Sequence, residues 1–178
     1  MQSQKNANTL TKNNLIKFLK TSHFKLIMNA KAEEEFNKAE TAYNLAENLL
    51  KEEKYPECVD QFQKTVEHAL KSLLILYNIK YPPNHGITNF LPEIIEKIPE
   101  SDPNHLFYSE TVLPPFIAIS TILLSIRNLA NYSYQTKGQN KSIPASQIFN
   151  EGIAQSVSIL FDSNYGLLRA WITDLLYQ

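Results

Sequence analysis

The chain has 178 residues, of which 43% are hydrophobic and 20% are charged, a composition typical of one globular domain with a sizeable core. Its formal net charge of −1 excludes a global basic field, so any contact with RNA has to be a local patch. A single cysteine, Cys58, excludes an intrachain disulfide framework and fits a reducing compartment.

The N-terminal part of the chain predicts three helices. Residues 11–28 carry apolar residues at loose helical spacing, which predicts one helix within an N-terminal extension spanning 1–30. Over 31–53 and again over 56–79, apolar residues recur at alternating intervals of three and four. They are Phe36, Ala39, Tyr43, Ala46 and Leu50, then Val59, Phe62, Val66, Leu70, Leu73 and Tyr77. The connection between the two segments is short, which predicts a long antiparallel helix hairpin.

The rest of the chain continues the helical pattern. We expect a short helix over 87–98, a polar loop over 99–110, and a helix from Pro114 or Pro115 to about Tyr134. A weakly basic loop follows, and then a last helical region to Tyr177, broken near 162–164 where turn residues cluster. The predicted fold is an all-α, up-and-down bundle of five to six helices, with the bundle spanning 31–178.

Targeting signals are not evident in the sequence. Residues 1–14 lack the apolar core of a secretory signal. The uncharged run 111–126 is shorter than the ~20 residues of a membrane span, and Pro114 and Pro115 interrupt it. We therefore expect a soluble, cytoplasmic protein that does not bind a membrane.

The most informative polar residue is Arg127, which ends that uncharged run. Asn128, Asn131, Tyr132 and Tyr134 follow it closely. A permanently charged guanidinium beside a buried helix needs partners or a ligand. In an unbroken helix, Arg127, Asn131 and Tyr134 share one face, and Tyr132 points away from it. No phosphate-binding glycine loop is present, and no histidine or cysteine pair has the spacing of zinc ligands, so no metal or cofactor is expected.

Three features over about 32–162 together resemble the HEPN family, small all-α domains named for higher eukaryotes and prokaryotes nucleotide-binding. The first is the helix pair, in which 42–50 leads through Tyr55 and Pro56 into the second helix. The second is the segment 65–74, Thr-Val-Glu-His-Ala-Leu-Lys-Ser-Leu-Leu, with His85 after the following loop. The third is Arg127 with its polar followers.

The resemblance implies a metal-independent ribonuclease site in which arginine and histidine from two subunits meet across a dimer interface. Arg127 and Asn128 match the family motif, but Tyr132 occupies the position of its histidine. The resemblance assigns Arg127, Asn128 and Tyr132 to the catalytic position. The residues themselves suggest three substrate-binding candidates: Glu67, which can orient Arg127; Asn131, on the same helix face; and Lys137, in the following loop. Tyr134 matches the tyrosine that a partner nucleotidyltransferase modifies with AMP in paired toxin members.

Tyrosine has an ordinary pKa near 10, so Tyr132 is a poor general base at neutral pH, whereas histidine titrates there. The resemblance therefore implies an RNA- or nucleotide-binding protein that cuts poorly or not at all. It would be either a degenerate ribonuclease toxin or the companion of a minimal nucleotidyltransferase.

Several alternatives stay open. Arg127 can instead close a buried ion pair with Glu67, and the whole domain can be a non-catalytic dimerisation or interaction module. An active ribonuclease that uses Tyr132 is a third reading, and DNA is not an expected ligand. A homodimer is expected from the apolar face of one helix, made of Phe116, Ile117, Ile119, Ile122 and Leu123.

Overall fold

The computed structural model describes residues 2–81, 87–131, 134–135 and 142–177. Side chains are described for the same residues except 2–22, 88, 127, 128, 130, 131, 134 and 135. In chain order the elements are α1 (Gln2–Lys51), α2 (Tyr55–Leu76), the 3-10 turn η1 (Ile87–Phe90), α3 (Leu91–Lys97), the π-helical turn η2 (Phe107–Val112), α4 (Leu113–Asn131), β1 (Tyr134–Gln135), β2 (Ser142–Ile143), α5 (Ala145–Ile148) and α6 (Glu151–Tyr177). The predicted all-α bundle is confirmed, with six α-helices in the described part of the chain.

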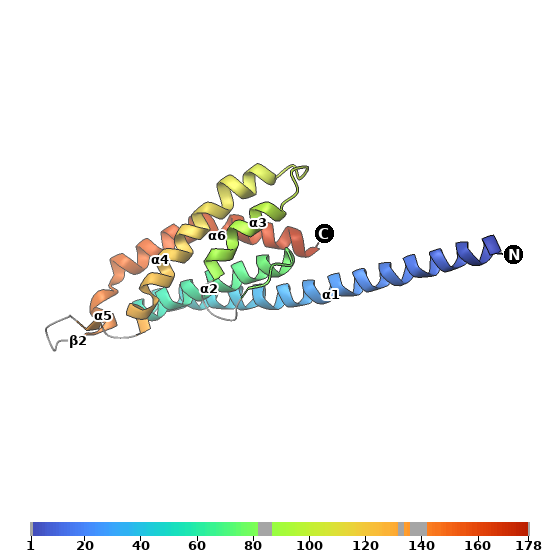
Figure 1. The fold of residues 1–178 in the computed structure, drawn as a ribbon. Helices are drawn as coiled ribbons and strands as arrows, with labels where there is room; N and C mark the ends of the chain where they lie inside the picture. The colour runs from blue at the N-terminus through green and yellow to red at the C-terminus, as the bar shows by residue number, and fades with distance from the viewer. Residues whose placement is uncertain (1, 82–86, 132–133, 136–141, 178) are drawn as a thin grey trace.

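The bundle is organised around α2, which packs against α1, α4 and α6 (Figure 1). Its contact with α1 is close because Ala32, Ala39 and Ala46, spaced by seven residues, are all completely buried. Small side chains at one register let the two helix axes approach each other. The buried Ser72 hydroxyl of α2 also donates to the backbone carbonyl of Ala32 at 2.8 Å. The predicted antiparallel hairpin is thereby confirmed.

Both helices of the hairpin end in the same way. At the end of α1, Glu53 adopts a positive φ of 59°, and Lys54 N–H donates to the Leu49 carbonyl at 2.9 Å. At the end of α2, Asn78 has a φ of 53°, and Ile79 N–H donates to the Leu74 carbonyl at 2.8 Å. These are Schellman motifs, which satisfy carbonyls at the helix end and turn the chain sharply. The left-handed residue is therefore what sets the chain direction between α1 and α2.

The N-terminal helix differs from the prediction. We expected separate helices over 11–28 and 31–53, whereas α1 is a single helix from Gln2 to Lys51. Neither glycine nor proline occurs in this stretch, so nothing in its backbone chemistry stops the helix. Its N-terminal part projects well beyond the rest of the bundle (Figure 1).

The helical region around α4 begins earlier than predicted. Residues 99–110 were expected to form a loop, but the π-helical turn η2 starts at Phe107 and leads directly into α4. Pro114 and Pro115 lack an N–H and their rings crowd the preceding turn, so a regular α-helical register is unfavourable there. The wider π turn, in which Leu113 N–H donates to the Tyr108 carbonyl, lets the helix pass the two prolines.

The last helix was predicted to break near 162–164, but α6 is continuous through these residues and the interruption lies at Phe149 and Asn150. The side chains of Ser163 and Asn164 donate to the helical carbonyls four residues earlier, at 2.7 and 2.8 Å. Residues that favour turns are tolerated within a helix when their polar groups bond back to it in this way.

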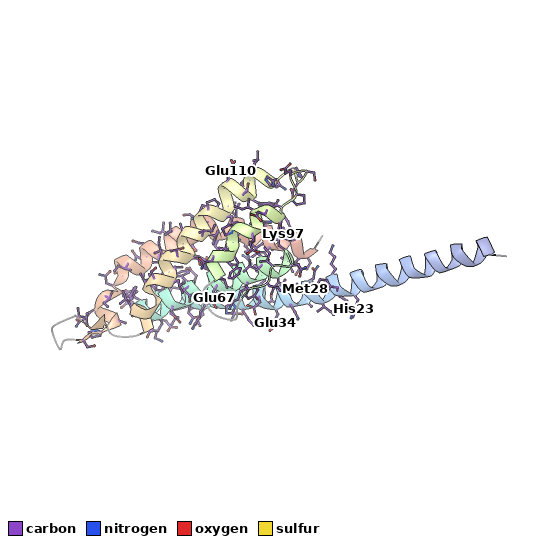
Figure 2. All side chains as sticks on the ribbon, viewed as in Figure 1. His23, Met28, Glu34, Glu67, Lys97 and Glu110 are labelled. Atoms are coloured by element: carbon purple, nitrogen blue, oxygen red, sulfur yellow. The ribbon has the colours of Figure 1, made fainter. Side chains whose placement is uncertain are left out.

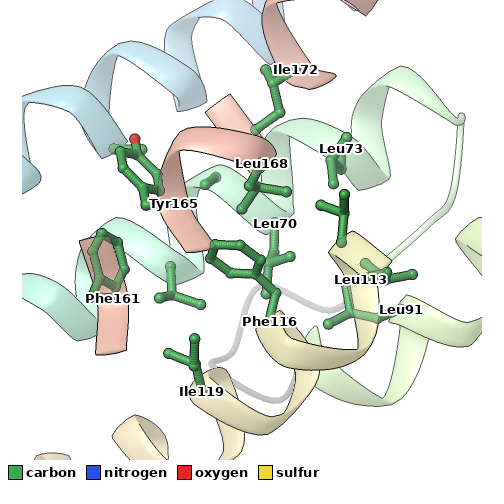
Figure 3. Packing of buried hydrophobic residues seen from close by; sticks show 14 of the residues in the cluster. Leu70, Leu73, Leu91, Leu113, Phe116, Ile119, Phe161, Tyr165, Leu168 and Ile172 are labelled. Atoms are coloured by element: carbon green, nitrogen blue, oxygen red, sulfur yellow. The ribbon is translucent and has the colours of Figure 1, made fainter. Parts of the chain in front are cut away.

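The hydrophobic core joins α2, α4 and α6. In Figure 3, Phe116 of α4 lies close to Leu70 of α2 and Leu168 of α6 in one core cluster. Phe116, Ile119 and Leu123 are at most 3% exposed, whereas Ile122 is 50% exposed. Most of the α4 face that we assigned to a dimer interface is therefore consumed by the core of a single chain, and that argument for a dimer was wrong.

One helical segment among the described residues, Phe107–Ile126, is long and apolar enough to cross a membrane by length and composition alone. The core helix of a soluble protein has the same properties. Phe116, Ile119 and Leu123 of this segment pack inside the bundle and belong to its core.

Candidate functional site

A stripe of polar residues runs along α2 beside its apolar stripe. Asp60, Gln63 and Glu67 are each only 5–6% exposed, and the Lys71 side chain is 14% exposed. Lys71 Nζ contacts Glu67 Oε1 at 2.6 Å, and Lys64 Nζ contacts Asp60 Oδ2 at 2.8 Å. Buried charges are costly, and they are retained where they are paired or have a specific role. We call Asp60, Gln63, Glu67 and Lys71 the polar stripe.

Gln63 occupies the middle of the polar stripe in one defined orientation. Its Nε2 donates to Glu67 Oε2 at 3.1 Å, and because a carboxylate only accepts, the amide oxygen must point elsewhere. That oxygen, Gln63 Oε1, is buried, and no donor among the described groups lies within hydrogen-bond distance of it. A buried acceptor without a donor costs roughly 1–3 kcal/mol. The polar stripe therefore presents an acceptor suited to an N–H group.

The turn of α4 that carries Arg127 lies beside this stripe. The helices α2 and α4 pack antiparallel, with Phe116 next to Leu70 (Figures 1 and 3). Arg127 follows Phe116 by about three helical turns. Because α2 runs in the opposite direction, the matching position on α2 lies three turns before Leu70, in the turn that contains Val59 and Asp60. The backbone of Arg127 is thus in register with the first half of the polar stripe, and Glu67, two turns further along α2, is buried.

The other predicted site residues divide into two groups. Arg127, Asn128 and Asn131 belong to the last turns of α4, and Tyr134 belongs to β1, where it pairs with Ile143. The side chains of these four residues are outside the described part of the structure, and Tyr132 and Lys137 are outside it altogether. Glu67 is the one predicted site residue whose side chain is described.

The end of α4 changes the prediction about faces. Arg127, Asn131 and Tyr134 were expected on one face of an unbroken helix, but α4 ends at Asn131 and Tyr134 is extended. Tyr134 therefore does not share a helical face with Arg127. We placed Tyr132 away from the Arg127 face on the assumption that the helix is unbroken. Because α4 ends before β1, that assumption does not hold, and the reason for excluding Tyr132 falls away.

A separate groove of about 440 Å³ opens on the outer face of α1 and α2. It is lined by Glu34, Asn37, Lys38, Thr41, Ala42, Leu45, Gln61, Lys64 and His68, and none of the predicted site residues belongs to it. Lys38 contacts Glu35 at 2.7 Å, and His68 Nδ1 contacts Glu35 Oε2 at 2.8 Å. Because its lysines and histidine are already paired with carboxylates, this groove is a poor site for an anion.

Comparison with known proteins decides the family. Residues 32–140 match the HEPN domain family, and they are more than half of the chain. The chain belongs to the HEPN domain family. Searches among curated proteins and among solved structures gave no match.

The family match begins where the helix pair of this HEPN protein begins to pack. Ala32, its first residue, is also the first completely buried residue of α1 among those with described side chains. The match contains all of α2 and α4, and therefore both the polar stripe and Arg127.

Asp60, Gln63 and Lys71 were not among the site residues predicted from the sequence. Their spacing with Glu67, at intervals of three and four, is as regular as that of the apolar residues. The signal was present, but polar residues at helical spacing are usually solvated, and only their burial in the folded bundle distinguishes them from a solvated face.

Proposed function

We propose that this HEPN protein binds RNA or a nucleotide in a groove centred on Arg127, and that it is a degenerate ribonuclease toxin or the partner of a minimal nucleotidyltransferase. The observation that supports the proposal is the polar stripe of α2, which is buried and whose first half is, by residue spacing along two antiparallel helices, in register with the Arg127 turn. A carboxylate close to an arginine can orient its guanidinium toward a phosphate. Replacing buried ion pairs by apolar residues often leaves a core equally stable or more stable. Stability alone therefore does not explain the polar stripe, and a ligand site does.

The residue at the histidine position sets the expected chemistry. Cleavage of RNA without a metal needs a general base for the 2′-hydroxyl, and Tyr132 has an ordinary pKa several units above neutral pH. Arg127 alone can stabilise phosphate charge. We therefore propose binding with weak or absent cleavage; any activity that remains would be that of a metal-independent endoribonuclease.

The first experiment replaces Arg127 by alanine and measures the affinity for RNA and for nucleotides. A charge-assisted hydrogen bond contributes about 1.5–3 kcal/mol, which corresponds to a loss of affinity of roughly 10- to 150-fold. Arg169→Ala is the matched control, because Arg169 is the other arginine of the chain and is 56% exposed in an ion pair with Glu40. Unchanged binding and unchanged toxicity in cells for Arg127→Ala would refute the proposal.

A second experiment tests catalysis and pairing. The purified protein is incubated with structured RNA in the presence of a chelator, and we expect the RNA to stay intact; cutting that Tyr132→Phe abolishes would instead establish Tyr132 as a catalytic residue. With a nucleotidyltransferase encoded beside this protein and ATP, we expect the mass increase of one AMP, which Tyr134→Phe removes. A mass increase that persists in Tyr134→Phe would exclude this residue as the modified one.

The competing function is a non-catalytic dimerisation module, and one observation favours it. Ile153, Leu160 and Leu167 of α6 are spaced by seven residues, and all three are 38–46% exposed. They form an apolar stripe on a helix face, as in helices that pair with a second copy. We propose a homodimer through this face, and we expect Leu160→Glu to make the particle monomeric in light scattering. Leu106→Glu, at another exposed leucine, should not change the mass. A monomeric native protein would refute the homodimer.

A further inference from the structure

The charges of this chain are divided between two parts. Residues 1–32 contain six lysines and no aspartate or glutamate. The remaining 11 of the 17 basic residues and all 18 acidic residues lie in 33–178, which gives that part a net charge of −7. The overall charge of −1 therefore hides a strongly basic segment attached to an acidic bundle.

The structure separates the basic segment from the bundle in space. Residues 2–27, which we call the basic arm, form the part of α1 that extends past the other helices, and His23 marks its inner end in Figure 2. Phe24, Leu26 and Ile27 are 51%, 68% and 41% exposed. The bundle begins to hold α1 at the inner end of the arm, where Phe24 and Lys25 line a pocket with Leu76 and Leu175. Just beyond, the Asn29 side chain reaches the Leu176 carbonyl and Ala32 is buried. The arm has lysines at 5, 12, 17, 20 and 25.

The composition of the basic arm indicates which anionic partner it fits. Nine of the thirteen residues 2–14 are Asn, Gln, Ser or Thr, side chains that together with lysine make most contacts to phosphate and sugar. A membrane-surface helix instead collects its apolar residues on one face. In this arm Leu15, Phe18, Leu19 and Leu26 share a face, but only over its inner half; residues 2–14 contain Ala7 and Leu10 as their only apolar residues and so have no such face. Two arms of the same chain would repel each other because both are positive.

We propose that the basic arm binds the phosphate backbone of RNA molecules that are long enough to extend from the Arg127 groove. The inference rests on the proposed function for the identity of the polyanion, but it concerns a different segment. Residues 28–51 of α1 separate the arm from the hairpin end of the bundle, which is about 35 Å at the α-helical rise. At roughly 2.8 Å per base pair of an A-form RNA duplex, a ligand that reaches both needs more than about twelve base pairs.

The test compares two RNAs and three variants of the full-length chain. The arm variant carries Lys→Gln at 5, 12, 17 and 20, and the matched control carries Lys→Gln at the exposed positions 51, 54, 80 and 97. The third variant is Arg127→Ala. Affinities are measured by fluorescence anisotropy between about 50 and 200 mM salt. The two ligands are an RNA hairpin of about 24 base pairs, roughly twice the span of about twelve, and a four-nucleotide RNA, which is far shorter than that span.

For the arm variant we expect at least a tenfold loss of affinity for the hairpin at low salt. The slope of log K against log salt should become less steep by up to about 3.6, which is roughly 0.9 for each lysine that contacts a phosphate. Binding of the four-nucleotide RNA should not change, and the control variant should bind both RNAs as the native chain does.

Three outcomes would overturn the inference. One is an equal loss in the arm and control variants, which would mean that total charge alone matters. Another is no loss in the arm variant. The third is binding of the native chain to vesicles with anionic lipid, lost in the arm variant while RNA binding is unchanged, which would make a membrane the partner. Binding of the four-nucleotide RNA by Arg127→Ala tests only the groove proposed around Arg127. Binding of the hairpin by the arm variant tests only the basic arm, so the two proposals can fail independently.

Discussion

The turn between α1 and α2 gives a prediction whose size follows from one backbone angle. Glu53 has a φ of 59°, in the left-handed region, and its side chain is exposed. A residue with a Cβ pays about 1–2 kcal/mol in this conformation, whereas glycine does not. Glycine loses roughly 0.5–1 kcal/mol more backbone entropy on folding. We expect Glu53→Gly to stabilise the protein by about 0.5–1 kcal/mol.

The measurement is urea unfolding followed by circular dichroism, together with thermal melting. The midpoint should rise with an unchanged m-value, and a gain of this size should raise Tm by roughly 1–4 °C for a chain of this length. Asn78→Gly, at the corresponding position after α2, should give a smaller gain because asparagine tolerates a positive φ better than glutamate does.

Lys51→Gly is the opposite control. Lys51 is the last residue of α1 and is helical, so glycine there should destabilise the protein by up to about 1 kcal/mol. If Glu53→Gly were no more stable than the native protein while its m-value stayed the same, the left-handed conformation would not be the source of the strain, and the reasoning would be refuted.

Three further predictions concern the helix pair and its ionisable groups. Ala39 is completely buried between α1 and α2, so Ala39→Leu should cost about 1–3 kcal/mol in urea unfolding, whereas the same change at an exposed position of α1 should cost little. Burial raises the pKa of the Cys58 thiol to about 12. At pH 8, iodoacetamide should therefore alkylate the folded protein about 10³-fold more slowly than the protein unfolded in urea. Similar rates in the two states would show that the thiol is accessible. Burial alone would raise the pKa of Glu35, but hydrogen bonds from Lys38 and His68 outweigh it and lower that pKa. A carboxylate with a lowered pKa stabilises the folded state above its unfolded pKa, near 4.3, and this stabilisation is lost as pH falls through the folded pKa. Glu35→Gln should therefore be less stable than the native protein at pH 7 and equally stable well below about pH 4. A stability difference that stays constant with pH would contradict this account of Glu35.

The amino-acid sequence alone determined the helical content, the hairpin and the family. Apolar residues at intervals of three and four define which side of a helix is buried, whatever it packs against, and Phe36, Ala39 and Leu70 all lie where this rule puts them. Helix ends were less predictable. Pro114 and Pro115, and the turn formers at 162–164, are strong local signals that a π-helical turn and side-chain bonds to the helix overrode.

Only the tertiary structure decided how each face is used. The sequence shows that Phe116, Ile119 and Leu123 are apolar, but whether they face α2 of the same chain or a second copy depends on the packing of helices far apart in the sequence. For the same reason, Asp60 and Gln63 have the pattern of ordinary surface residues in the sequence, and only the folded bundle shows that they are buried. Periodicity is a local property that fixes a helix face, whereas the burial of that face is a property of the whole fold.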